Sequence, residues 1–378
     1  MSFLDEPSRD VRRYPVACPD ISELEIEAAA DTVRSTWISS IGPRLEEFET
    51  SFAEACGVEH AIAVANGTVA MHVALEALRI GPGDEVIVPS LTYIATANTV
   101  RYTGATPVFA DVSPDTWCLD PDHVASLIGP RTVAIVAVHL YGHPADMDAL
   151  GEIARAHGLA LLEDAAEAPF ATYRGRTTGG LGAVAGFSFF GNKIITCGEG
   201  GAVTTNDSHL AERVRLLRGQ GMDPDRRYFF PVVGYNYRLT NVAASILCAQ
   251  MSRKKELLAR RDQLFAAYDS AFADMGAIEL QPVAPWATRA PWLYTILLRG
   301  EGLDRDDVMS RLSADGVDSR PMFIPLHTLP PYQDPAGEPL PVTDDLAKRG
   351  LSLPTSSIWG PEDAREVARR LGRILARS

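Results

Sequence analysis

Short apolar segments alternate with helical segments from about residue 59 to residue 163, and this alternation constrains the fold more than any other feature. Strands are expected at residues 61–65, 85–89, 106–112, 133–138 and 159–163. Helices are expected at residues 69–78, 94–102 and 147–157. Continuous apolar strands separated by helices are typical of a parallel sheet with helices on both faces. The sequence therefore predicts an α/β fold.

The pattern changes beyond residue 240. Residues 241–268 indicate one long helical stretch, rich in Ala, Leu and charge, and a strand at 293–298 and a helix at 304–315 follow it. This second part predicts a smaller α+β domain. We expect a large domain over residues 1–250 and a small C-terminal domain over residues 251–378.

The composition narrows the class of ligand. The 378-residue chain has a net charge of −14, and its longest basic run is Arg253-Lys254-Lys255, which disfavours nucleic acid as a partner. A local site must therefore bind any anionic ligand, which favours a small phosphorylated molecule over a polymer. No apolar run of about 18 residues occurs, and residues 1–14 lack the apolar core of a signal peptide. We expect no membrane partner and a cytoplasmic location.

The five cysteines are scattered along the chain and odd in number. They form neither a C-x-x-C pair nor a cluster with histidine. This spacing argues against a disulfide framework and against structural zinc. We expect reduced thiols and no metal site.

Four segments near the expected carboxyl ends of strands carry residues suited to chemistry. The first, Asn66-Gly67-Thr68, stands between an expected strand and an expected helix. Gly67 permits a tight turn there, and the amides at a helix N-terminus bind phosphate well. Junctions of this kind also occur without a ligand, so this segment alone does not establish a phosphate site.

The second segment is Glu163-Asp164-Ala165-Ala166-Glu167, at the end of the strand expected at residues 159–163. A carboxylate in this position can pair with a pyridinium nitrogen and keep the ring protonated, so that the ring accepts electrons. The alternative is that Asp164 caps the helix that follows.

Lys193 lies in the third segment, residues 187–193, among apolar and small residues. Removal from water lowers the pKa of a lysine and frees its amine to form a Schiff base. Ser188 of the same segment could bind a phosphate oxygen. The alternative is a surface lysine at the end of a strand.

The fourth segment, Gly198-Glu199-Gly200-Gly201, would let the backbone approach a ligand or another part of the chain closely. An ordinary tight turn has the same composition. Together the four segments offer a phosphate cup, a carboxylate for a ring nitrogen and a lysine able to form a Schiff base. This combination in this order is harder to obtain by chance than any one of its parts.

The chain contains the motifs EDAAEA, FSFFGNKIITCGEGGAVTTND and GYNYRLTNVAA, and further motifs extend from TWISSIG at residues 36–42 to SRPMFIPLHTLPPY at residues 319–332. With these motifs it resembles the DegT-type sugar aminotransferases over nearly its whole length. The resemblance implies a fold-type-I enzyme that uses pyridoxal 5'-phosphate to aminate nucleotide-linked keto-sugars. It also implies a large domain with a mainly parallel sheet and a smaller C-terminal α+β domain.

The resemblance assigns roles to residues that match the motifs of the family. It implies that Lys193 carries the cofactor as a Schiff base and that Asp164 pairs with the pyridine nitrogen. Tyr93 would stack on the ring, and Glu167 would lie near the ring hydroxyl, where many relatives carry Gln. The residues that would hold the phosphate are Gly67, Thr68 and Ser188.

The same resemblance implies a homodimer with shared active sites, because Asn236 matches a residue that reaches the phosphate in the neighbouring subunit. Weaker candidates for substrate contact are Arg238, Arg320 and His327, each of which could instead lie on the surface or pack in the core. Some relatives replace the lysine with histidine and remove a hydroxyl, so Lys193 favours transamination.

Segments such as PSLTYIA, LRGQGMDPDRRYFFPVVGYNYR and RPMFIPLHTLPPY resemble the members that transfer an amino group from L-glutamate to C4 of GDP-4-keto-6-deoxy-D-mannose, with 2-oxoglutarate as the second product. The alternatives are a 3-keto GDP sugar and a dTDP- or UDP-linked 4-keto sugar. A non-catalytic regulator on the same fold is a further alternative, which Lys193 and Asp164 disfavour. A plain nucleotide-binding α/β protein is disfavoured because no G-x-G-x-x-G follows a strand.

Overall fold

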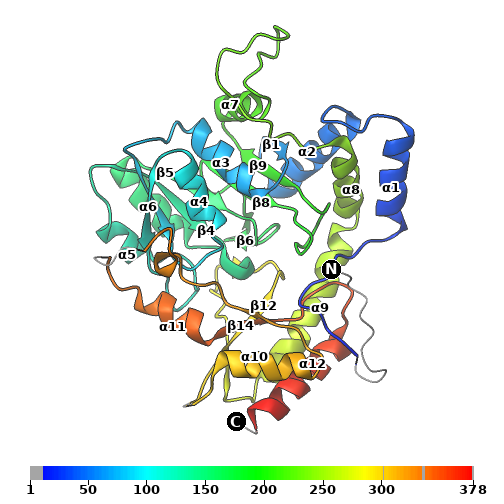
Figure 1. Ribbon diagram of the computed structural model, residues 1–378, viewed down its shortest axis with the longest axis vertical. Coiled ribbons are helices and arrows are strands. Elements are labelled where there is room, and N and C mark those ends of the chain that lie inside the picture. The colour runs from blue at the N-terminus through cyan, green and yellow to red at the C-terminus, as the bar shows by residue number, and fades with distance from the viewer. Residues whose placement is uncertain (1–11, 301, 334–336, 377–378) are drawn as a thin grey trace.

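A seven-stranded sheet with helices on both faces forms the larger part of the molecule (Figure 1). The computed structural model describes residues 12–300, 302–333 and 337–376, so most of the segment expected to lack a signal peptide lies outside the described residues. The strand order is β1-β9-β8-β5-β4-β2-β3. The strands are β1 (His60–Val64), β2 (Glu85–Pro89), β3 (Thr106–Ala110), β4 (Thr132–Val138), β5 (Ala160–Asp164), β8 (Val184–Ser188) and β9 (Gly201–Thr205).

Side chains alternate along these strands and supply two apolar faces, because successive residues of a strand point to opposite sides. Val86 and Val88 of β2 pack on one side, whereas Ile87 packs on the other. The first face is covered by α3 (Gly67–Ala77), α4 (Ala95–Tyr102) and α7 (Ser208–Arg218). The second is covered by α2 (Pro43–Cys56), α5 (Pro121–Ser126), α6 (Met147–His157) and α8 (Asn241–Ser252), and α1 (Glu23–Arg34) packs on α8.

The smaller part of the molecule is an antiparallel sheet of order β10-β12-β14-β13, packed against helices (Figure 1). Its strands are β10 (Ile278–Leu280), β12 (Tyr294–Leu298), β13 (Arg320–Pro321) and β14 (Gly350–Leu353). Its helices are α9 (Lys254–Phe272), α10 (Arg305–Ala314), α11 (Pro341–Arg349) and α12 (Pro361–Leu375). A short sheet of β6 (Thr172–Tyr173), β7 (Arg176–Thr177) and β11 (Ala287–Thr288) joins the two parts.

The expected α/β architecture with a smaller α+β part is confirmed, and the sheet is mainly parallel. β9 is the exception, because it pairs antiparallel with both β1 and β8. The sequence interpretation assigned no strand to residues 201–205, which follow the glycine-rich segment. The five cysteines are free thiols, as expected.

The prediction of a single helix over residues 241–268 is wrong. The structure divides this stretch into α8 and α9 at Arg253, whose backbone leaves helical geometry with φ −92° and ψ 0°. The Arg253 guanidinium is nearly buried and pairs with Asp20 at 2.7 Å and with Glu25 at 3.1 Å. These ion pairs hold Arg253 in place at the break between the two helices, because burying its guanidinium or either carboxylate without a partner would be costly. The boundary expected after residue 250 lies inside α8 and stays a prediction.

Candidate active site

A cavity of about 470 Å³ opens where three parallel strands of the large sheet end. Val138, Asp164 and Ser188 are the last residues of β4, β5 and β8, and all three line it. Ligands of open α/β sheets bind at this edge, because the carboxyl ends of the strands and the following loops meet there. Other lining residues are Gly67, Thr68, Tyr93, Thr96, Tyr141, Glu167, Asn192, Lys193, Glu199, Trp292, Arg320 and Phe323.

A phosphate-sized cup lies between the N-terminus of α3 and the end of β8. Asn66 caps this helix, because its Oδ1 accepts a hydrogen bond from the Val69 amide at 3.0 Å. The first amides of a helix have no intrahelical partner and carry partial positive charge. A Cβ atom on Gly67 would lie 2.7 Å from the Cβ of Ser188, so glycine is what allows the hydroxyl of Ser188 to come this close. The donors in this cup suit a phosphate group.

The glycine-rich segment after Lys193 packs against the backbone at the start of α3, and none of its glycines lines the cavity. A Cβ atom on Gly201 would lie 2.5 Å from the main-chain oxygen of Asn66. Backbone therefore approaches backbone here, where β9 passes the start of α3. Of the four residues in this segment, Glu199 lines the cavity.

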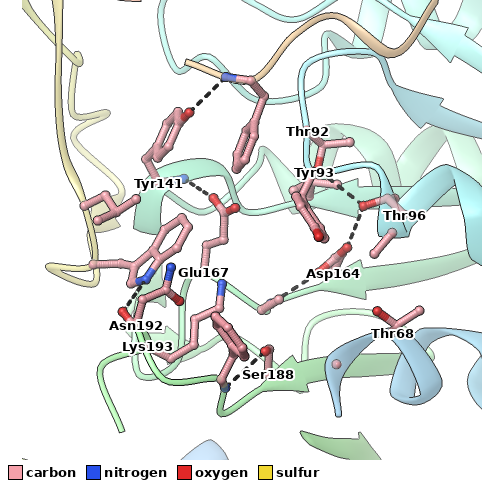
Figure 2. Close-up of a pocket in the computed structure, with 18 of the residues that line it drawn as sticks. Thr68, Thr92, Tyr93, Thr96, Tyr141, Asp164, Glu167, Ser188, Asn192 and Lys193 are labelled. Carbon is pink, nitrogen blue, oxygen red and sulfur yellow. Dashed lines mark hydrogen bonds between the residues drawn. The ribbon is translucent and has the colours of Figure 1, made fainter. Parts of the chain in front are cut away.

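Asp164 is held in one orientation within the cavity. Its Oδ2 accepts a hydrogen bond from the Thr96 hydroxyl at 2.7 Å, and its Oδ1 accepts one from the Ala166 amide at 3.2 Å. The hydroxyls of Thr92 and Thr96 lie 3.3 Å apart (Figure 2). The carboxylate is only 7% exposed. The alternative role as a helix cap is wrong, because residues 165–171 form turns and no helix follows β5 there.

Lys193 reaches the same cavity from the loop after β8, and its side chain points toward Glu167 (Figure 2). Burial lowers the pKa of the Lys193 amine, while the nearby Glu167 and Asp164 carboxylates oppose that shift and Arg320 adds to it. The alternative of a surface lysine is wrong. A buried amine with a lowered pKa is more available as a nucleophile than an ordinary lysine.

Glu167 faces Lys193 and is only 4% exposed. Its Oε2 accepts a hydrogen bond from the Tyr141 amide at 2.8 Å. Burial raises the pKa of Glu167 to about 7, and the positive charge of Lys193 limits the rise. Tyr141 adopts φ 50° and ψ 32°, which few residues other than glycine adopt, and this backbone aims its amide at the carboxylate.

The remaining expected residues fall into two groups. Tyr93 and Arg320 line the cavity and are largely exposed. Asn236, Arg238 and His327 do not line it. The Asn236 Oδ1 accepts hydrogen bonds from the Arg238 guanidinium at 3.0 and 3.1 Å. His327 lies against Ser90, with 2.7 Å between its Nδ1 and the serine hydroxyl.

Sequence reasoning missed several residues that shape the cavity: Thr96, Tyr141, Trp292 and Phe323. Thr96 lies in the first turn of α4, next to the strand end of β2, and no local pattern in the sequence pairs it with Asp164. No local pattern identifies Trp292 or Phe323, because both reach the cavity only through the packing of the small sheet against the large one.

The residues present fit pyridoxal phosphate on structural grounds. A cup of amide and hydroxyl donors, a fixed carboxylate and a buried amine open into one cavity. These groups match the phosphate, the ring nitrogen and the aldehyde of the cofactor. Among the described residues, no group of three His, Cys, Asp or Glu side chains could hold a metal ion, and no helix is long and apolar enough to cross a membrane.

Comparisons with known proteins agree with this geometry. Two relatives cover nearly the whole chain. A GDP-perosamine synthase of Caulobacter vibrioides is 51% identical, over 97% of this chain and 99% of its own. A dTDP-3-amino-3,4,6-trideoxy-alpha-D-glucose transaminase of Streptomyces venezuelae is 43% identical, over 93% and 94%.

A solved structure supports the same assignment. DesV of S. venezuelae, crystallised in complex with a ketimine intermediate, superposes with a TM-score of 0.87 at 41% identity, covering 92% of this chain and 93% of that one. The model of the DegT/DnrJ/EryC1/StrS aminotransferase family matches residues 19–372. The chain belongs to this family and is a pyridoxal-phosphate-dependent sugar aminotransferase.

Proposed function

We propose that this enzyme transfers the amino group of L-glutamate to C4 of GDP-4-keto-6-deoxy-D-mannose, giving GDP-perosamine and 2-oxoglutarate. The reaction type follows from the family and from the joint placement of Asp164, Lys193 and the phosphate cup in one cavity. The observation that carries the choice of sugar is the 51% identity over 97% of the chain to a GDP-perosamine synthase.

The chain's own residues would act as follows. Gly67, Thr68 and Ser188 bind the cofactor phosphate, and Asp164 pairs with the ring nitrogen and keeps it protonated. Lys193 holds the cofactor covalently and, once released, moves a proton as general base and then as general acid. Bound pyridoxal phosphate supplies an electron-withdrawing ring and carries the amino group between the two substrates.

Glu167 and Tyr93 would complete the cofactor environment. Glu167 lies beside Lys193 and, with a pKa of about 7, can exchange a proton near neutral pH. Tyr93 offers an aromatic face at the mouth of the cavity, suited to stacking on a pyridine ring. Arg320, which also lines the cavity, is a donor for the anionic substrate.

The proposal includes a homodimer in which each subunit completes the other's active site. Asn236 is exposed and lies outside the cavity of its own chain, as a residue that serves a neighbour would. Exposed apolar side chains shortly before Asn236 along the chain, including Tyr228 and Val233, are a further reason to expect a covered surface. A symmetric dimer would bury these apolar side chains of both subunits in one interface.

The experiment is a panel of keto-sugar nucleotides offered to the purified enzyme with pyridoxal phosphate and L-glutamate. The GDP-linked 4-keto sugar should be turned over at least tenfold faster than its dTDP and UDP counterparts. Turnover of the dTDP-linked sugar alone would overturn the proposed substrate and favour a dTDP-linked sugar. The 43% identical S. venezuelae transaminase is named for a dTDP-linked sugar, although one that carries its amino group at C3.

A further inference from the structure

Trp292 lies directly over the amine of Lys193. The Lys193 Nζ is 3.8 Å from the centroid of the Trp292 ring. Trp292 is only 3% exposed, so its ring is largely removed from water at this contact. The face of an indole ring attracts a cation, and the attraction is strongest where the cation is removed from water. The ring therefore favours the protonated amine.

The same side chain also holds the backbone that carries Lys193. The Nε1–H of Trp292 donates a hydrogen bond of 3.0 Å to the main-chain oxygen of Asn192, the residue before the lysine. The Lys193 amide in turn donates to the Phe190 oxygen at 2.9 Å. One indole thus contacts both the reactive amine and the loop from which it projects.

Trp292 is itself fixed from several directions. Arg261 of α9 is 2% exposed, and its Nη1 donates to the main-chain oxygen of Trp292 at 3.1 Å. The Trp292 ring stacks on Tyr141 at 6.0 Å between centroids, and Tyr141 stacks on Phe323 at 5.4 Å. The Ala290 amide donates to the Gly142 oxygen at 2.8 Å, which docks this segment onto the Tyr141 loop. These contacts leave the indole little freedom to move.

We propose that Trp292 is a positioning residue for Lys193: its ring face stabilises the protonated amine, and its N–H holds the Asn192–Lys193 loop in place. This inference rests on the proposed role of Lys193 as the point of cofactor attachment. It also gives the small sheet a part in the chemistry, because Trp292 stands just before β12.

Other charges act on the same amine and must be kept constant in a test. Glu167 and Asp164 favour the protonated Lys193, whereas burial and Arg320 disfavour it. Glu199 lines the same cavity. Variants at Trp292 leave all four of these side chains in place, so a change in Lys193 can be attributed to the indole.

The experiment measures covalent attachment of pyridoxal phosphate to the cofactor-stripped full-length protein as a function of pH. Borohydride reduction traps the product, and mass spectrometry of peptides identifies the lysine. The variants are Trp292→Leu, which removes face and N–H, and Trp292→Phe, which keeps a face and removes the N–H. The control is Trp286→Leu, on the same segment, where the indole packs on Tyr173 at 4.7 Å and on His143 at 5.4 Å.

The two functions of the indole predict two separate effects. Loss of the face lets the amine lose its proton more readily, so the midpoint of the rate–pH profile shifts to lower pH in Trp292→Leu. Loss of the N–H frees the loop, so the limiting rate at high pH falls several-fold in both Trp292 variants. Trp292→Phe should keep the midpoint close to that of the original protein, and Trp286→Leu should keep both values.

The outcomes separate this inference from the proposed function. Trapping on a lysine other than Lys193 in the original protein would overturn the proposed role of Lys193 and this inference with it. Trapping on Lys193, with Trp292→Leu matching Trp286→Leu in midpoint and limiting rate, would overturn the role of Trp292 alone. Trp292→Phe, which conserves an aromatic ring of similar shape, serves as the test if Trp292→Leu does not fold.

Discussion

The floor of the cavity and its outer wall are built in different ways. The floor consists of Gly67, Thr68, Asp164, Ser188 and Lys193, which end strands β5 and β8, lie in the loop after β8 or begin helix α3. The outer wall consists of Trp292, Arg320 and Phe323, which come from the segments around the small sheet. The floor is fixed by short hydrogen bonds and close backbone packing, whereas Arg320 in the wall is exposed.

This difference suggests a division of work. A fixed floor suits a cofactor that is the same in every turnover, because preorganised groups cost no rearrangement when the reaction occurs. Within the wall, the exposed Arg320 suits the part of the substrate that differs among relatives. We therefore expect substitutions in the floor to reduce turnover and a substitution of Arg320 in the wall to change mainly the affinity for the sugar nucleotide.

The largest effect is expected for Lys193→Ala, at the centre of the floor. This variant removes the covalent attachment and the group that moves the proton, so turnover should fall by roughly three or more powers of ten. Steady-state assays with L-glutamate and the GDP-linked keto-sugar measure the loss. Substantial turnover by the variant without an added amine would show that another residue performs this role.

Asp164→Asn should have the next largest effect. The amide keeps the shape of the side chain but loses the charge that holds the ring nitrogen protonated. We expect a rate about a hundredfold lower, which corresponds to roughly 3 kcal/mol in the barrier. Pre-steady-state absorbance changes after mixing with L-glutamate measure the step directly. A rate close to that of the original enzyme would mean that another group holds the nitrogen.

Arg320→Met probes the outer wall and should separate it from the floor. Loss of one charged donor should raise KM for the sugar nucleotide about tenfold, equivalent to about 1.4 kcal/mol, with kcat little changed. Arg365→Met on α12 is the matched control, because Arg365 forms an exposed pair with Glu362 and such pairs contribute little. A fall in kcat at unchanged KM would place Arg320 with the floor.

The smallest effect is on stability and concerns Glu167, whose pKa is raised from 4.5 to about 7 by burial. The unfolded chain loses this proton first, so the free energy of unfolding should fall as pH rises between these two values. Glu167→Gln has no proton to lose and should show a flatter dependence. Urea unfolding of both cofactor-free proteins at about pH 5 and about pH 7.5 measures the difference. If the free energy of unfolding changed with pH by the same amount in both proteins, the raised pKa of Glu167 would be contradicted.

The floor could be predicted from the sequence, and the outer wall mostly could not. Asp164 ends a strand that its apolar run predicts. Lys193 was located by its apolar surroundings and its family motif, because no strand was expected at residues 184–188. Trp292 and Phe323 stand far from these motifs along the chain and meet them only after the small sheet packs. Arg320 was identified through its family motif and not through its surroundings.

Two features of the fold were not predicted from the sequence, for related reasons. The reversed direction of β9 depends on how the loop from Phe189 to Gly200 folds back, where the Phe189 amide bonds the Gly200 oxygen at 2.7 Å. The break between α8 and α9 depends on Asp20 and Glu25, which lie more than two hundred positions before Arg253. Neither contact leaves a periodic signal in the sequence.

The measurement that tests the central claim most directly follows the nitrogen atom. The enzyme is given pyridoxal phosphate, ¹⁵N-labelled L-glutamate and GDP-4-keto-6-deoxy-D-mannose, and the nucleotide product is isolated for mass spectrometry and NMR. The account predicts one ¹⁵N atom bonded to C4 of the sugar, together with one equivalent of 2-oxoglutarate. An amine at C3, or a product without the label, would contradict it.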